Sequence, residues 1–260
     1  MKFMDQVMYL QILSDLASID YSEYLSFVGW CEPFSQPSFL NRIKEASEYL
    51  PNAMLASNSN SDYLTTEVVE QAADNGLHLL RAQLYFDKDE DCTEEIIGRK
   101  LCELKAKLLG IEFEEREGHW YALVGGKMTL HVQSKNFKDV GINRCDIPLT
   151  KVRKRYHTCY EGVQYFGINY TGWAVPCCHI RSDYPPHKES LLGQITSEPG
   201  KIFELYQGVI LPERQYPCSG CSHPQSHANV KIVYSEILRE LQNDRSRTHN
   251  SSESKVGSIQ

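Results

Sequence analysis

The chain has 260 residues, of which 41% are hydrophobic and 23% charged, so it is long enough for one large domain, or one medium and one small, around a buried core. Its net charge of −7 and the lack of any basic run longer than KVRKR (151–155) argue against nucleic-acid binding, because phosphate neutralisation needs a concentrated cationic face. No apolar run is long enough to span a bilayer, and residues 1–20 lack the features of a signal peptide. We therefore expect a cytoplasmic protein with no membrane partner.

Helices and strands alternate along the first half of the chain. In chain order, the pattern predicts a helix at 4–18, a strand at 24–30, a helix at 38–50, a strand at 53–58, a helix at 64–76, a strand at 77–86, a helix at 92–110, a strand at 111–115 and a hairpin over 119–132 with a type I′ turn at Gly125-Gly126. Alternation at this spacing indicates βαβ units, and hence a parallel sheet with right-handed crossovers. The chain opens with a helix, where a complete βα barrel opens with a strand.

The pattern changes past residue 140. The sequence becomes turn-rich and cysteine-bearing up to about residue 229, a closing helix is predicted at 230–242, and the polar tail at 243–260 is expected to be disordered because it has little apolar content. We therefore expect four segments, which are an α/β domain at 1–140, a cysteine-rich domain at 141–229, the closing helix and the tail.

Four of the nine cysteines indicate a metal site. In a reducing compartment, clustered cysteines suggest metal or redox chemistry in preference to disulfides. Cys159 and Cys177 bracket a predicted hairpin with its turn at Thr171-Gly172, and a hairpin brings its two ends together. Cys218 and Cys221 form a C-x-x-C knuckle that directs two thiolates at one centre. Such a set suits tetrahedral zinc or a [4Fe–4S] cluster, and the presence of a single knuckle favours the cluster.

The remaining cysteines and the nearby histidines have simpler interpretations. Cys178 follows Cys177 directly, and neighbours in an extended strand point to opposite faces, so we expect Cys178 to be packed or a spare thiol. Cys92 and Cys102 are expected to be small buried or half-buried hydrophobes. Three histidines lie close enough to the cysteines to substitute as ligands, although a polar surface histidine is the commoner situation: His179, His223 and His227.

Two stretches resemble one known family, the radical S-adenosylmethionine (SAM) enzymes. FVGWCEPFSQPSFLNRIKEASEYLPNAMLASNSNSDYLT resembles the second and third βα units of that family, where one strand ends in a Gly-Gly-Glu-Pro-like motif and the next in a Thr-Asn-Gly-like turn. CYEGVQYFGINYTGWAVPCCHIRSD, followed by LLGQI and YPCSGC, resembles the family's C-terminal SPASM or shorter twitch extension. Its pattern of Cys, nine to fifteen residues, Gly, four residues and Cys is matched by Cys159, Gly172 and Cys177, with twelve and four residues between them.

The resemblance implies a fold and a set of ligands. The fold would be a partial (βα) TIM-like barrel missing its first strand, followed by a small cysteine-rich α+β extension. An auxiliary [4Fe–4S] cluster would bind to the four cysteines named above. SAM would bind at the rim formed by the carboxyl ends of the strands, near Glu32, Pro33 and Asn58. Without the resemblance, Glu32 is a helix-entry acid and Asn58 a turn former.

The sequence also departs from the family. The loop C-x₃-C-x₂-C, which binds the SAM-cleaving cluster in the family, is absent from these residues, so we expect that this chain alone does not cleave SAM. Cys31 replaces the second Gly of the Gly-Gly-Glu-Pro motif. His227 and Lys231 occupy the third and fourth cysteine positions of a full SPASM domain, which favours the one-cluster twitch form.

Three functions remain open at this point. The first is a truncated radical SAM tailoring enzyme, which acts on a small molecule or a peptide and takes electrons from a donor such as a flavodoxin or ferredoxin. The second is a non-catalytic relative that keeps only the auxiliary cluster and serves as a binding or scaffold protein. The third is an unrelated zinc-stabilised α/β protein.

Overall fold

The computed structural model describes residues 4–29, 31–87, 90–135, 165–196 and 198–207. The described residues fall into two compact units, one made of 22–135 and the other of 4–21 together with 165–207. The sequence-based division at residue 140 stays a prediction. The predicted helix at 230–242 and the tail at 243–260 lie outside the described residues.

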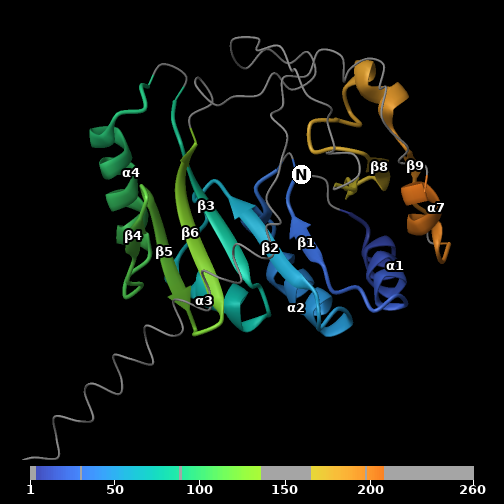
Figure 1. Cartoon of the computed structure of the whole chain (residues 1–260), viewed down its shortest axis with the longest axis horizontal. Coiled ribbons are helices and arrows are strands. Elements are labelled where there is room, and N and C mark those ends of the chain that lie inside the picture. Colours follow the sequence, from blue (N-terminus) through green and yellow to red (C-terminus); the bar gives the residue numbers. More distant parts are fainter. Residues whose placement is uncertain (1–3, 30, 88–89, 136–164, 197, 208–260) are drawn as a thin grey trace, which may run out of the picture. The chain divides into compact units, whose positions relative to one another are not determined.

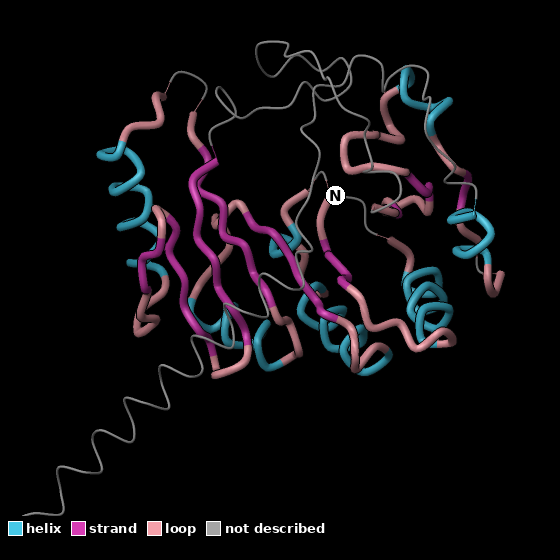
Figure 2. Tube along the Cα trace, viewed as in Figure 1, coloured by secondary structure: helices cyan, strands magenta, loops and turns pink. Residues whose placement is uncertain are grey.

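The unit 22–135 follows the predicted order of helices and strands. Its elements are β1 (Tyr24–Phe27), the 3₁₀ helix η1 (Pro33–Ser35), α2 (Phe39–Tyr49), β2 (Met54–Ser59), α3 (Thr66–Asp74), β3 (Leu79–Tyr85), α4 (Glu94–Lys107), β4 (Glu114–Arg116), β5 (His119–Val124) and β6 (Met128–Lys135). Figure 2 shows the strands side by side as one sheet.

The strands form a mixed sheet in the order β1-β2-β3-β6-β5-β4 (Figure 1). β1, β2, β3 and β6 pair in parallel, whereas β5 and β4 continue the sheet in antiparallel pairs. The predicted α/β class with a parallel sheet is therefore confirmed. The strand expected at 111–115 begins instead at Glu114 and lies at the sheet edge. The hairpin strand β6, in which Met128 to Val132 are buried, takes the place beside β3, whereas the short and charged β4 lies at the sheet edge.

One face of this sheet packs against helices. The rings of Phe27 in β1 and Phe39 in α2 meet edge to face, with 5.6 Å between their centroids. Leu55, Leu80 and Leu130 are fully buried in the adjoining strands. Right-handed crossovers between strands that run in one direction place their helices on the same side. The residues that alternate with this apolar set therefore point to the other face of the sheet.

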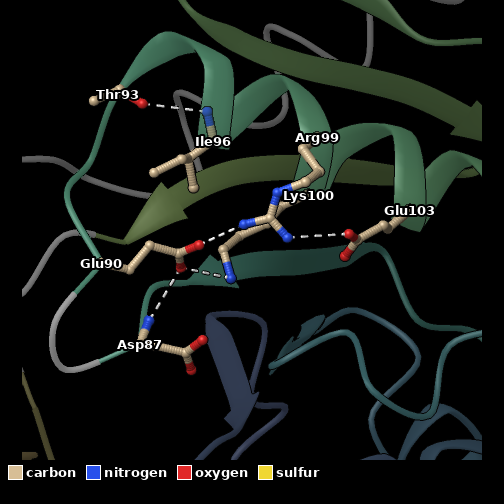
Figure 3. Close-up of polar contacts among 7 residues, drawn as sticks. All are labelled: Asp87, Glu90, Thr93, Ile96, Arg99, Lys100 and Glu103. Atoms are coloured by element: carbon tan, nitrogen blue, oxygen red, sulfur yellow. Dashed lines mark hydrogen bonds and ion pairs between the residues drawn. The ribbon is translucent and has the colours of Figure 1, made fainter.

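Helix α4 is fixed at its amino end by polar contacts with the preceding loop (Figure 3). The Thr93 hydroxyl accepts a hydrogen bond from the Ile96 amide at 3.3 Å and caps the helix. The Glu90 carboxylate pairs with Arg99 at 2.5 Å and with Lys100 at 2.9 Å. These contacts hold Glu90 against the first two turns of α4.

The predicted hairpin between β5 and β6 is confirmed. Gly125 and Gly126 have φ angles of 57° and 72°, which side-chain-bearing residues adopt at a cost. The Lys127 amide donates to the Val124 carbonyl at 3.1 Å and closes the turn. Positive φ at both central residues is the geometry of a type I′ turn, which matches the twist of the strands that it joins.

The second unit is smaller and contains a three-stranded antiparallel sheet in the order β7-β8-β9. Its elements are α1 (Gln6–Ala17), β7 (Gly167–Ile168), β8 (Trp173–Val175), the 3₁₀ helix η2 (Pro185–Ser190), β9 (Gly193–Gln194) and α7 (Lys201–Gln207). The predicted turn between Cys159 and Cys177 is found where expected, with the Gly172 amide donating to the Asn169 carbonyl at 2.9 Å. Within the described ranges, no helix is both long and apolar enough to cross a bilayer.

Candidate functional site

A row of polar side chains crosses the face of the large sheet that points away from the helices. The strand register aligns Asn58 of β2 with Arg81 of β3, Arg81 with His131 of β6, and His131 with Tyr121 of β5. Residues aligned in this way share one face of the sheet. We call Asn58, Arg81, His131 and Tyr121 the polar row. Four neighbouring strands thus contribute one polar side chain each to a common surface.

Arg81 is held in a fixed orientation within the polar row. One guanidinium nitrogen donates to the Tyr24 hydroxyl at 2.8 Å and to the Asn58 side-chain oxygen at 3.3 Å. The guanidinium carbon lies 5.8 Å from the centroid of the Tyr24 ring, within the range of a cation–π contact. A half-buried, oriented guanidinium is suited to bind a carboxylate through two parallel hydrogen bonds.

His131 forms the centre of an aromatic cluster. Its Nε2 lies 3.2 Å from Nδ1 of His119, and its ring stacks on Tyr121 with 4.6 Å between centroids and 13° between planes. Only 4% of His131 is exposed. Burial, followed by the proximity of His119 and Arg81, lowers the pKa of His131 to about 3. His131 is therefore a neutral imidazole at physiological pH, and its Nε2 is within hydrogen-bonding distance of His119.

Glu32 joins the loops that follow β1 and β2. Its carboxylate caps η1 by accepting the Phe34 amide at 3.2 Å, which confirms the helix-entry interpretation. The same carboxylate accepts the Ser59 hydroxyl at 2.9 Å and the Asn60 amide at 2.6 Å. Pro33 is the buried first residue of η1. The contacts of Glu32 with Ser59 and Asn60 join the loop after β1 to the end of β2, where Asn58 lies, while the role of Glu32, Pro33 and Asn58 as SAM ligands stays a prediction.

The unit 22–135 contains three cysteines, of which Cys92 is half-buried, as expected, and Cys31 and Cys102 are exposed. Cys31 is exposed, and partial desolvation of its sulfur, together with the Glu32 carboxylate, raises the pKa of the thiol. Cys31 is therefore mostly protonated at neutral pH and poorly suited to metal binding. Cys102, expected to be buried or half-buried, is instead exposed on α4.

Of the four predicted cluster ligands, the structure describes Cys177, while Cys159, Cys218 and Cys221 lie outside the described residues. Cys177 is half-buried and packs against Val175 and Ile180. The expectation of an extended strand through Cys177 and Cys178 is wrong. β8 ends at Val175, before Pro176, and the Ile180 amide donates to the Cys177 carbonyl at 3.1 Å in a tight turn. Alternation between opposite faces does not apply inside such a turn.

The turn brings three donor side chains together. The sulfurs of Cys177 and Cys178 and a ring nitrogen of His179 all lie within 4.8 Å of one another. Cys178 Sγ is 3.7 Å from His179 Nε2, and the His179 amide donates to Cys177 Sγ at 3.3 Å. Cys178 is exposed, whereas His179 is only 4% exposed and is not the surface histidine that its sequence context predicted. His223 and His227 lie outside the described residues.

The sequence analysis missed most of the polar surface. Tyr24, Arg81, His119, Tyr121 and His131 were not singled out, although the alternation in β3 (LLRAQLY) and β6 (MTLHVQSK) contains the signal. In both strands, polar residues recur at every second position, which indicates one apolar face and one face that carries polar side chains.

No family model matches the sequence, and no curated protein is similar to it in sequence. Among solved structures, the chain is similar in fold to BtrN. BtrN in complex with AdoMet and 2-DOIA aligns with a TM-score of 0.55 at 14% identity, over 87% of this chain and 85% of that chain. Selenomethionine BtrN in an open conformation aligns with a TM-score of 0.49 at 15% identity, over 78% of this chain and 67% of that chain. The class defined by the fold is mixed α/β with a parallel sheet. The chain shares this fold with BtrN in its AdoMet complex.

Proposed function

We propose that this chain is a radical SAM-type tailoring protein in which the sheet unit at 22–135 binds SAM and the cysteine-bearing unit holds an auxiliary [4Fe–4S] cluster. The observation that supports the proposal most is the polar row on the sheet face opposite the helices, which meets the carboxyl ends of the parallel strands at Asn58, the fifth of the six residues of β2. Open α/β sheets bind ligands beyond those strand ends. The fold likeness to BtrN, which was crystallised with AdoMet, is consistent with this placement. AdoMet is the same molecule as SAM.

The chemistry of the polar row fits the groups of SAM. The methionyl end of SAM carries a carboxylate, and Arg81 offers a guanidinium already oriented by Tyr24 and Asn58. The sulfonium is a cation that favours an aromatic face, and the Tyr24 ring lies beside Arg81. The resemblance implies that the backbone beside Glu32 meets the methionyl ammonium group. These residues would bind and orient the cofactor.

The environment of Cys177 fits an iron–sulfur ligand. Its sulfur already accepts a backbone amide hydrogen bond, a contact that stabilises thiolates and tunes iron–sulfur clusters. The residue lies two positions after the end of β8, in a turn that the Ile180 amide closes on the Cys177 carbonyl. The proposal adds Cys159, Cys218 and Cys221 as the other three ligands, and an electron donor such as a flavodoxin or ferredoxin as a partner. The substrate would be a small molecule or a peptide.

When bound at a cluster with one open iron, SAM supplies radical chemistry. These 260 residues contain no C-x₃-C-x₂-C loop, and four cysteine ligands would fill every iron of the auxiliary cluster. We therefore expect the chain to bind SAM without cleaving it. The assay is dithionite-reduced protein with SAM, followed for 5′-deoxyadenosine. Release of that product above the level of cluster-free protein would contradict this part of the proposal.

The affinity for SAM tests the site itself. Arg81→Ala should weaken SAM binding at least about tenfold, equivalent to about 1.4 kcal/mol, because a charge-assisted contact with the carboxylate is lost. The matched control is Arg99→Ala on α4, where the side chain is 55% exposed and pairs with Glu90 and Glu103. Arg99→Ala should bind SAM like the unmodified chain. Equal affinities for all three proteins, measured by calorimetry, would contradict the assignment.

Metal analysis separates the cluster from the zinc alternative. Anaerobic reconstitution should give about four irons and four sulfides per chain. Replacing Cys159, Cys177, Cys218 or Cys221 singly by Ala should lower the iron content sharply, whereas Cys102→Ala should not. Stoichiometric zinc without sulfide would favour a zinc-stabilised α/β protein instead.

A further inference from the structure

The turn after β8 gathers more metal donors than the proposed cluster uses. Cys177, Cys178 and His179 are consecutive in sequence, yet their two sulfurs and one ring nitrogen converge within 4.8 Å. In a cubane each thiolate binds a different iron, so the ligands surround the cluster from separate directions. Three donors that converge on one point suit a single ion.

The spacing of the donors fits one tetrahedral cation. Zinc binds sulfur at about 2.3 Å and imidazole nitrogen at about 2.0–2.1 Å, so a tetrahedral angle separates the two donors by about 3.6 Å. Cys178 Sγ and His179 Nε2 are 3.7 Å apart. Cys177 Sγ also lies within 4.8 Å of both of these donor atoms.

The local structure also supports the three donors. The His179 amide donates to Cys177 Sγ, and the Ile180 amide closes the turn on the Cys177 carbonyl. His179 is buried and Cys177 is half-buried against Val175 and Ile180, so two ligands are fixed by packing. Cys178 is exposed, which leaves the site open to an ion arriving from solvent.

We propose that Cys177, Cys178 and His179 form a mononuclear site for a borderline divalent cation of the zinc class, with a fourth position open to water or another ligand. The inference goes beyond the proposed function, because it assigns Cys178 and His179 a role that the cluster does not need. Since both sites use Cys177, the ion and the cluster would compete for its thiolate. Zinc at this turn would therefore oppose cluster assembly.

Cobalt(II) is the probe for this site, because its visible and near-ultraviolet bands report tetrahedral geometry and thiolate ligation. The full chain, freed of metal with a chelator under anaerobic conditions, should bind about one Co²⁺ with thiolate-to-metal charge transfer. Cys178→Ala and His179→Gln should each weaken Co²⁺ binding about 100-fold. Loss of a residue that only supports a ligand costs up to about 100-fold, and loss of a ligand should cost at least as much. The matched control Cys102→Ala, which removes another exposed thiol, should bind like the unmodified chain.

The double variant Cys218→Ala/Cys221→Ala distinguishes this site from the cluster ligands. It should keep its Co²⁺ affinity while losing iron and sulfide after reconstitution. Co²⁺ binding that survives Cys178→Ala, that depends on Cys218 and Cys221, or that is absent from the unmodified chain would overturn the proposal. Because Cys178 is exposed, its variant should fold normally, and near-ultraviolet circular dichroism checks this. Iron and sulfide contents of the same proteins report separately on the proposed function.

Discussion

Glu32 shows how one side chain can organise the edge of the sheet. Its carboxylate accepts hydrogen bonds from Phe34, Ser59 and Asn60, and so joins the loops after β1 and β2. Glu32→Ala should lower the free energy of unfolding by about 1–3 kcal/mol, because it leaves half-buried donors without their acceptor. Urea denaturation measures the change. Glu48→Ala, at a surface ion pair where both side chains are 62% exposed, should cost less than about 1 kcal/mol. Equal losses would contradict this account of Glu32.

His131 should make stability depend on pH. Its pKa is lowered to about 3 in the folded chain, from an ordinary value near 6.5, so the unfolded chain binds more protons between these values. Stability should therefore fall as pH falls from about 6.5 toward 3, by up to about 1.4 kcal/mol per pH unit from this group. His131→Gln should flatten this slope.

Urea denaturation at pH 7 and pH 5 checks the prediction for His131. His78, whose pKa burial also lowers, contributes to the slope of both proteins and cancels in the comparison. If the unmodified chain and His131→Gln lose the same stability between the two pH values, His131 is not held neutral by the fold.

At the scale of elements, the β7–β8 turn should be sensitive to a single methyl group. Gly172 has φ of 83°, and a Cβ there would lie 2.9 Å from the Met8 side chain and 3.0 Å from the Ile195 carbonyl oxygen. Gly172→Ala should destabilise the small unit and reduce iron retention, because the same hairpin positions Cys177. Gly200→Ala is the matched control, since Gly200 has φ of 79° but nothing within 4 Å of its added Cβ.

Thermal unfolding and iron content measure both glycine variants. Gly200→Ala should show only the cost of the left-handed backbone, about 1–2 kcal/mol. Gly172→Ala should show that cost together with the loss from crowding. Identical behaviour of the two variants would mean that the turn yields easily to the added methyl group.

The sequence predicted which segments form helices and strands better than it predicted which strands lie side by side. Helices and strands of 22–135 follow from apolar periodicity, and the two hairpin turns from Gly125-Gly126 and Thr171-Gly172. The place of β6 beside β3 was not predictable in this way, because it depends on pairing between strands far apart in sequence. The polar row was not predicted for the same reason, since Arg81 and His131 become neighbours only through the pairing of β3 with β6.

The turn at Cys177 shows a different limit of sequence reasoning. Strand alternation was applied across Pro176, where the chain leaves β8 and bends. Proline lacks the amide hydrogen that a strand ladder requires, so it was the available signal that the strand had ended. Cys178 was set aside on that account and His179 as a surface histidine, and the structure brings the donor atoms of both close to Cys177.

At the scale of the whole molecule, the two units should respond differently to metal removal. A metal site in a small, turn-rich region substitutes for part of a hydrophobic core, so folding there should depend on the metal. Chelation or oxidative cluster loss should therefore expose the region 141–229 to protease, while the sheet unit at 22–135 stays comparatively resistant. Mass spectrometry of limited digests locates the cuts. Uniform digestion of both regions would contradict a metal-dependent second unit.

Hydrogen–deuterium exchange with and without SAM tests the central claim most directly, because it locates the ligand on the chain. Binding across the polar row and at the carboxyl ends of β1 and β2 should slow exchange in peptides that contain the loops after β1 and β2, at 28–36 and 58–64, and in β3 around Arg81. Peptides from α2 and α4, on the other face of the sheet, should exchange as before. The account predicts that SAM slows exchange in the loops after β1 and β2. It also predicts that Arg81→Ala abolishes this effect of SAM. Unchanged exchange throughout 22–135, or protection confined to the helices, would contradict it.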